Sequence, residues 1–88
     1  MKSITLKNEG QFVAADVLMV ALNTAPSGMS IDEIRKRCRV LERLAEANGT
    51  LVLEDADYST LVEALRGSRF TLADPALLRV IDAVLAPN

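Results

Sequence analysis

Hydrophobic and polar residues follow two different periods along the chain, and each period predicts a type of secondary structure. Residues 3–7 alternate, with Ile4 and Leu6 on one side. Alternation of this kind is typical of a strand with one buried face. A second short apolar run covers residues 50–54. We therefore expect two strands, near 3–7 and 50–54, that pair in a short sheet with helices packed on it, because such a pair is marginally stable alone.

The clearest helix signal lies at residues 30–46. Ser30 is a residue type favoured at an N-cap, and Glu33, three residues later, completes the sequence pattern of a capping box. Asn48 and Gly49 are typical of the residues that follow a helix C-terminus. The apolar residues of the segment recur at helical spacing, and we expect them to form its buried face, with Leu44 beside it: Ile34, Cys38, Leu41 and Ala45.

Residues 11–23 predict an earlier helix that is hydrophobic nearly all round, since Asp16 is its one polar residue away from the ends. Such a helix is either central to its fold or covered by a partner. The sequence leaves both alternatives open. If a second copy covers the helix, the expected oligomer face consists of Phe12, Val13, Val17 and Val20.

Two further helices are expected, at residues 56–66 and from Pro75 to the region of residue 85. Asp55 is a favourable N-cap for the first, and Asp74 before Pro75 is a favourable start for the second. The expected fold class is α+β and mainly helical: four helices and a short two-stranded sheet in a single small globular domain, residues 1–88. The expected buried residues of these two helices are Tyr58, Leu61, Val62 and Leu65, then Leu77, Leu78, Ile81, Val84 and Leu85.

The composition supports a small aliphatic core. Half of the 88 residues are hydrophobic, while Phe12, Tyr58 and Phe70 are the only aromatic residues. A chain of this length buries about two-thirds of its unfolded surface, so its stability margin is thin. Small domains often complete the burial of apolar surface by association. We therefore expect a homo-oligomer, with a protein partner as a further possibility.

The location expected from sequence is the cytoplasm. The first residues lack the apolar run of a signal peptide. The apolar segment from Phe12 to Leu22 contains Asp16 and is much shorter than the ~20 residues that cross a bilayer. A membrane partner is therefore not expected.

The residue types that carry most catalytic and metal-binding chemistry are sparse. The chain has no histidine and one cysteine, Cys38. A cysteine–histidine pair cannot be formed within it, and zinc would lack its usual ligands. We therefore expect no enzyme activity, no cofactor and no metal, and we expect Cys38 to be a core residue. The acidic residues Glu54, Asp55 and Asp57 could bind a divalent cation, but their spacing matches no EF-hand loop. Charge stabilisation of a helix N-terminus is the preferred interpretation.

A basic cluster on the helix at 30–46 is the remaining candidate site. A nucleic-acid partner is disfavoured by the net charge of −2, and a helix-turn-helix would need a turn at residues 37–39, where no glycine or proline stands. Acidic residues at helical spacing also favour a solvated face of mixed charge. The residues that would contact a phosphate backbone or an acidic partner are Arg35, Lys36, Arg39 and Arg43.

Three segments, Ser30–Leu44, Leu51–Tyr58 and Phe70–Leu77, together resemble small proteins encoded in phage and prophage genomes. The resemblance rests on structural motifs, namely a capped helix, a strand-to-helix junction and a helix that starts with proline. It implies an accessory or assembly role through protein contacts, and it transfers no site residue. The expected function is therefore a non-enzymatic, self-associating interaction module. The alternative is a small nucleic-acid-binding regulator.

Overall fold

The computed structural model describes residues 1–70 and 73–87. Within them the mainly helical α+β fold expected from the sequence is confirmed. The elements follow in the order β1 (Lys2–Thr5), α1 (Ala14–Asn23), α2 (Ile31–Glu46), β2 (Thr50–Leu53), α3 (Asp55–Gly67) and α4 (Pro75–Leu85).

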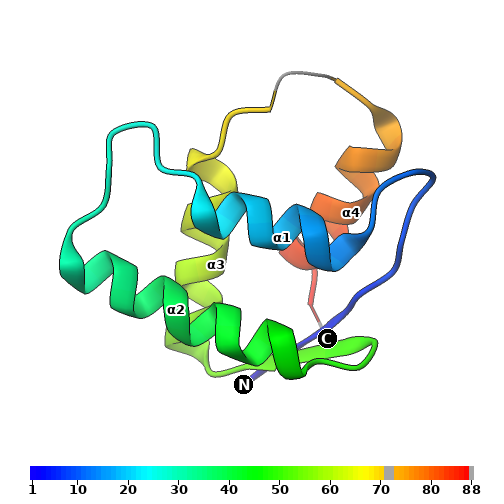
Figure 1. The fold of residues 1–88 in the computed structure, drawn as a ribbon. Coiled ribbons are helices and arrows are strands. Elements are labelled where there is room, and N and C mark those ends of the chain that lie inside the picture. The colour runs from blue at the N-terminus through cyan, green and yellow to red at the C-terminus, as the bar shows by residue number, and fades with distance from the viewer. Residues whose placement is uncertain (71–72, 88) are drawn as a thin grey trace.

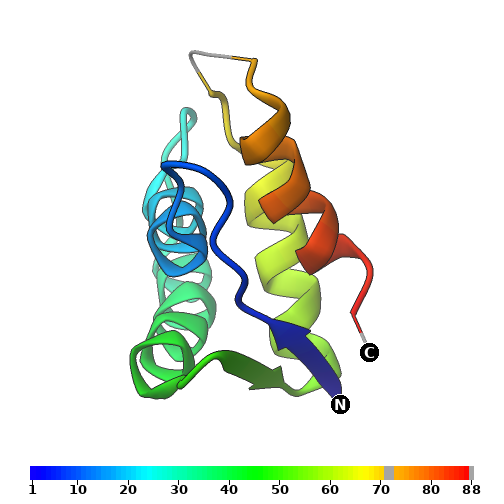
Figure 2. The same ribbon diagram turned by 90° about the vertical axis from the view of Figure 1, so that its right-hand side faces the viewer.

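The helices form two layers (Figures 1 and 2). Helices α1 and α2 lie in one layer, and α3 and α4 lie in the other. The two strands close one end of the molecule. They pair antiparallel, with Ile4 opposite Leu51 and Lys2 opposite Leu53, so the predicted pairing is confirmed. Ile4, Leu51 and Leu53 are buried and place one face of this small sheet against the helices.

The main core is aliphatic and lies between the two layers. Leu18 and Leu22 of α1, Val40 of α2 and Leu61 of α3 are each at most 1% exposed. Tyr58 is half-buried beside them, and its hydroxyl donates to the Val84 carbonyl at 2.9 Å, which ties α3 to the end of α4. The fold thus brings residues from both layers into one cluster.

The first helix starts later than the sequence indicates. Residues 11–13 precede α1, because Glu9 and Phe12 exchange two backbone hydrogen bonds in an isolated bridge. The Asn8 side chain then accepts from the Ala14 amide at 3.0 Å and satisfies one of the first free donors of the helix. An all-round apolar helix pattern does not reveal this turn, since Phe12 and Val13 are apolar in either structure.

The buried face of α2 also differs from the expected one. Val40 and Leu44 are buried, whereas Cys38 and Ala45 are exposed and Ile34 is 44% exposed. The prediction that Cys38 fills the core is therefore wrong. The helix is turned about its axis so that a different set of residues meets α1 and α3, and the physical reason lies in Arg37, described below.

The predicted N-cap is confirmed for α4 but is wrong by one residue for α3. Asp74 accepts from the Ala76 amide at 2.8 Å and caps α4 as expected. The N-cap of α3 is Glu54 rather than Asp55, and its side chain makes no capping hydrogen bond. In α4 Leu77 is buried as predicted, but Leu78 is 56% exposed.

Candidate functional site

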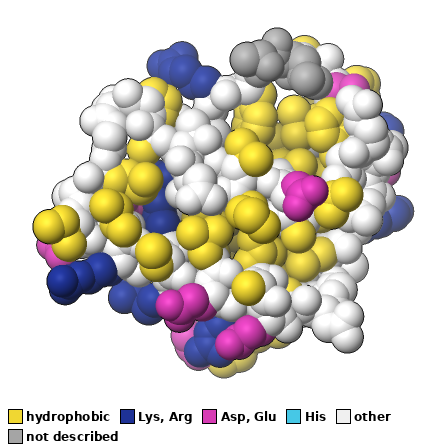
Figure 3. Space-filling view, in the orientation of Figure 1, with side chains coloured by type: hydrophobic (Ala, Val, Ile, Leu, Met, Phe, Trp, Pro, Cys, Tyr) yellow, Lys and Arg dark blue, Asp and Glu magenta, His cyan; other side chains and the backbone are white. Residues whose placement is uncertain are grey.

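Large hydrophobic side chains remain exposed on α1 and α2. On one face of the molecule, hydrophobic side chains cover much of α1 and the start of α2 (Figure 3). Exposed apolar surface of this kind on a small domain commonly marks a contact with another macromolecule. The most exposed of these residues are Val13 (43%), Met19 (45%) and Val20 (57%) on or beside α1, and Ile31 (70%) and Ile34 (44%) on α2.

The first of these surfaces is a groove along α1, with a volume of about 270 Å³. Its wall includes all four residues of the expected oligomer face, namely Phe12, Val13, Val17 and Val20. Val17 is only 8% exposed and forms the floor, while Val13 and Val20 stand open to solvent. The structure therefore brings these four together, although Phe12 and Val13 precede the helix.

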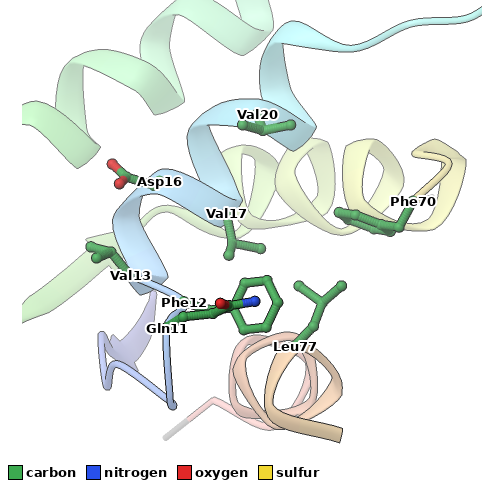
Figure 4. A pocket seen from close by; sticks show the side chains of 8 residues that line it. All are labelled: Gln11, Phe12, Val13, Asp16, Val17, Val20, Phe70 and Leu77. Carbon is green, nitrogen blue, oxygen red and sulfur yellow. The ribbon is translucent and has the colours of Figure 1, made fainter. Parts of the chain in front are cut away.

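The opposite wall of the groove comes from the other layer. Phe70, after α3, and Leu77, on α4, face Val17 and Phe12 across a common space (Figure 4). Asp16 is exposed at the rim. A second apolar hollow, about 460 Å³, shares Phe70 and Leu77 and continues along α4. Among the lining residues that the structure describes, Gln11 and Asp16 are polar and the others are apolar, so this lining is suited to apolar contact.

The second surface is a row of residues on α2, called here the α2 stripe: Ile31, Ile34, Cys38, Leu41 and Ala45. Ile31, Ile34, Cys38 and Ala45 are exposed, and Leu41 is half-buried. These are largely the residues that the sequence assigned to the core. They lie beside the buried face of the helix, which is centred on Val40 and Leu44.

Arg37 explains why the buried face of α2 is displaced. Its side chain is 13% exposed, and it donates to the carbonyls of Leu22 at 3.1 Å and Thr24 at 2.9 Å, with a longer contact of 3.5 Å to Ala21. These carbonyls belong to the C-terminal end of α1, where backbone acceptors lack partners within the helix and a positive charge is favourable. Arg37 therefore holds α2 against the end of α1.

Glu33 completes this contact. Its carboxylate accepts from Arg37 Nε at 3.1 Å, and its backbone amide donates to the Ser30 hydroxyl at 3.1 Å. The predicted N-cap at Ser30 is thus confirmed. The glutamate side chain, however, orients Arg37 instead of closing a reciprocal capping box. Sequence reasoning missed Arg37, although its position four residues after Glu33 is a recognisable ion-pair spacing.

The expected basic face of α2 is a surface of mixed charge. Arg35, Lys36, Arg39 and Arg43 are all exposed. Arg39 Nε lies 3.4 Å from the Asp57 carboxylate, so one of the four charges is paired within the fold. Arg39 and Arg43 also share a shallow polar hollow with Glu42, Glu46 and Asp57. Acidic neighbours at this range weaken the attraction for a phosphate backbone.

A helix-turn-helix within residues 31–47 is contradicted by the structure, because α2 is one continuous helix from Ile31 to Glu46. The turn that this motif requires at Arg37–Arg39 is absent from α2. Arg37 is instead committed to the end of α1. Recognition of DNA by a helix-turn-helix in this segment is therefore not available to the protein.

The acidic residues at the start of α3 act in contacts within the chain. Asp57 pairs with Arg39, and the Met1 ammonium lies 2.9 Å from the Asp55 carboxylate. A hydrogen bond from that ammonium, and then its charge, hold the pKa of Asp55 below its ordinary value. Within residues 1–70 and 73–87 no group of three or more potential ligands is arranged to hold a metal ion.

In the part of the chain that the structure describes, every helix is too short or too polar to cross a membrane. Comparison of the chain with protein-family models, curated proteins and solved structures finds no match.

Proposed function

We propose that the protein is a non-enzymatic interaction module that associates with itself. The observation that carries this proposal is the exposure of Ile31 and Ile34, two large aliphatic side chains on α2 that are 70% and 44% exposed. Removing apolar surface from water contributes about 25 cal/mol per Å², from which the entropy cost of association is subtracted. An accessory or assembly role is also what the resemblance to small phage and prophage proteins implies.

The alternative of a nucleic-acid-binding regulator has less support. Its contact residues are interleaved with Glu42, Glu46 and Asp57, and its helix-turn-helix form is contradicted. It would rest on Arg35, Lys36, Arg39 and Arg43 alone. The double variant Arg39→Glu, Arg43→Glu tests this alternative. If the wild type binds DNA and the variant binds it equally well, the binding does not come from phosphate contacts at these two positions.

Self-association is tested by sedimentation equilibrium of the wild-type chain over a range of protein concentrations. We expect a mass that rises above that of the 9.5 kDa monomer as the concentration enters the micromolar range. Addition of salt should leave most of the association intact, since salt screens charges but not apolar contacts. A chain that stays monomeric at high micromolar concentration would contradict the proposal.

A further inference from the structure

We infer that the α2 stripe binds the α2 stripe of a second copy, with the two helices antiparallel. This inference rests on the proposed self-association and specifies the surface, the symmetry and the charged contacts that would produce it. The surface differs from the groove on α1 that the sequence indicated for the same purpose.

The spacing within the stripe is that of a helix-pairing seam. Its five residues, Ile31 to Ala45, are separated by steps of three, four, three and four. Steps that alternate in this way place apolar residues at positions a and d of a heptad, the positions through which two helices interlock. Leu41 packs partly against the main core, but a helix that only covered that core would not need the exposed members of the row, Ile31, Ile34, Cys38 and Ala45.

The monomer leaves this row open. Ile31 is 70% exposed and Ile34 is 44% exposed, while Cys38 and Ala45 are exposed as well. Helix α2 already contacts its own domain through a neighbouring face, that of Val40 and Leu44. A second helix can therefore lie on the stripe without displacing α1 or α3.

The flanks of the stripe decide the direction of the pairing. One flank, heptad position g, consists of Arg37 and Leu44. The Arg37 side chain is 13% exposed, and Leu44 is 5% exposed. Both are occupied inside the monomer. The other flank, position e, consists of Arg35 and Glu42, which are exposed. A parallel pair brings e against g, whereas an antiparallel pair brings e against e. Only the antiparallel arrangement uses the open flank of both copies.

The charges on that open flank are complementary in the antiparallel arrangement. A two-fold axis between Arg39 and Val40 leaves Arg35 of one copy within about 3 Å of being level with Glu42 of the other along the helix, which is within reach of these two long side chains, and the symmetry repeats this pair. The same axis carries Ile34 toward Ala45 of the second copy, so a large side chain meets a small one. Two opposite-charge pairs beside the seam favour this register over shifted ones.

Charge reversal on the open flank tests the inference. The variant R35E would bring two carboxylates together at each of the two pairs, and the variant E42R would bring two guanidinium groups together there. Each variant alone should therefore weaken the dimer at least about tenfold. An equimolar mixture of the two variants allows a heterodimer with one copy of each to form. One pair in it then joins two native residues and the other joins two reversed residues, so both pairs are of opposite charge and the heterodimer should be recovered.

Sedimentation equilibrium measures the association of each variant and of the mixture, and circular dichroism checks that each variant is folded. Two controls make the result specific. Lys36→Glu changes charge on the same helix away from the stripe, and Val20→Lys places a charge on the groove of α1, so both should dimerise as the wild type does.

The outcomes separate the inference from the proposal on which it rests. The antiparallel pairing is overturned if the wild type dimerises and R35E and E42R each dimerise equally well. It is also overturned if both variants are monomeric and their mixture forms no heterodimer. In that case loss of the dimer in Val20→Lys would assign the interface to α1, and self-association would stand. A monomeric wild type would overturn both.

Discussion

Replacing Arg37 with methionine is expected to lower the free energy of unfolding by about 2–3 kcal/mol. The change removes the donors that satisfy the carbonyls of Leu22 and Thr24 at the end of α1. It also leaves the half-buried carboxylate of Glu33 without its partner. For a domain of this length the total stability is about 4–13 kcal/mol, so the loss would be a large fraction of the margin.

Urea denaturation of the Arg37→Met variant measures this effect, at one fixed protein concentration because association adds to apparent stability. Arg43→Met is the matched control, since it makes the same substitution at an exposed position of the same helix. We expect the control to change stability by less than about 1 kcal/mol. Arg37→Lys should fall between the two, because an ammonium cannot reproduce the guanidinium fork. Equal stabilities of Arg37→Met and Arg43→Met would contradict the role given to Arg37.

The second large effect is expected at Leu18, whose truncation to alanine should cost about 3 kcal/mol. Leu18 is fully buried in the cluster that joins α1 to α3 and to the small sheet. Its loss removes apolar contacts and leaves a cavity that the surrounding side chains fill only in part. The same kind of truncation at an exposed site would have no cavity to create.

Met19 provides that comparison, because it is the next residue of α1 and is 45% exposed. Met19→Ala should change the free energy of unfolding by less than about 1 kcal/mol, measured under the same conditions. If Leu18→Ala and Met19→Ala were equally tolerated, the rotation of α1 that turns Leu18 toward the core and Met19 toward solvent would be wrong.

Features that depend on a few neighbouring residues could be predicted from the sequence. Ser30 and Asp74 carry side-chain acceptors that cap the next turn, and the structure confirms both. The first strand was predicted because Ile4 and Leu6 alternate with polar residues, and the second because residues 50–54 form a short apolar run. The structure confirms that the two strands pair, although β1 ends at Thr5, before Leu6. Such local signals act over one turn or one strand and need no knowledge of the rest of the fold.

Features that depend on distant partners could not be predicted in the same way. The face of α2 was assigned from Ile34 and Cys38, the more apolar of two adjacent faces. The face that packs inward instead carries the buried Val40 and Leu44 together with the partly buried Arg37 and Glu33, and Arg37 donates to carbonyls at the end of α1 that lack partners within that helix. A hydrophobic pattern counts this ion pair as polar surface, and so it placed Cys38 in the core.

The two candidate surfaces show the same difference between local features and features that depend on distant partners. Phe12, Val13, Val17 and Val20 were grouped because they are apolar and close in sequence, and the structure gathers them at one groove. Four of the five residues of the α2 stripe were predicted as one row but were assigned to the interior: Ile34, Cys38, Leu41 and Ala45. The exposure of the stripe depends on Arg37, because the hydrogen bonds from Arg37 to the end of α1 fix the rotation of α2 about its axis.

The most direct test of the account uses the single cysteine of the chain. Cys38 is exposed on the α2 stripe, near the proposed two-fold axis, so a short bifunctional thiol reagent should join two wild-type copies into a covalent dimer under native conditions. The R35E variant should give little covalent dimer under identical conditions, while Lys36→Glu should match the wild type. A wild-type dimer in which Cys38 cannot be cross-linked, or an R35E variant that cross-links as readily as the wild type, would contradict the pairing of two α2 stripes.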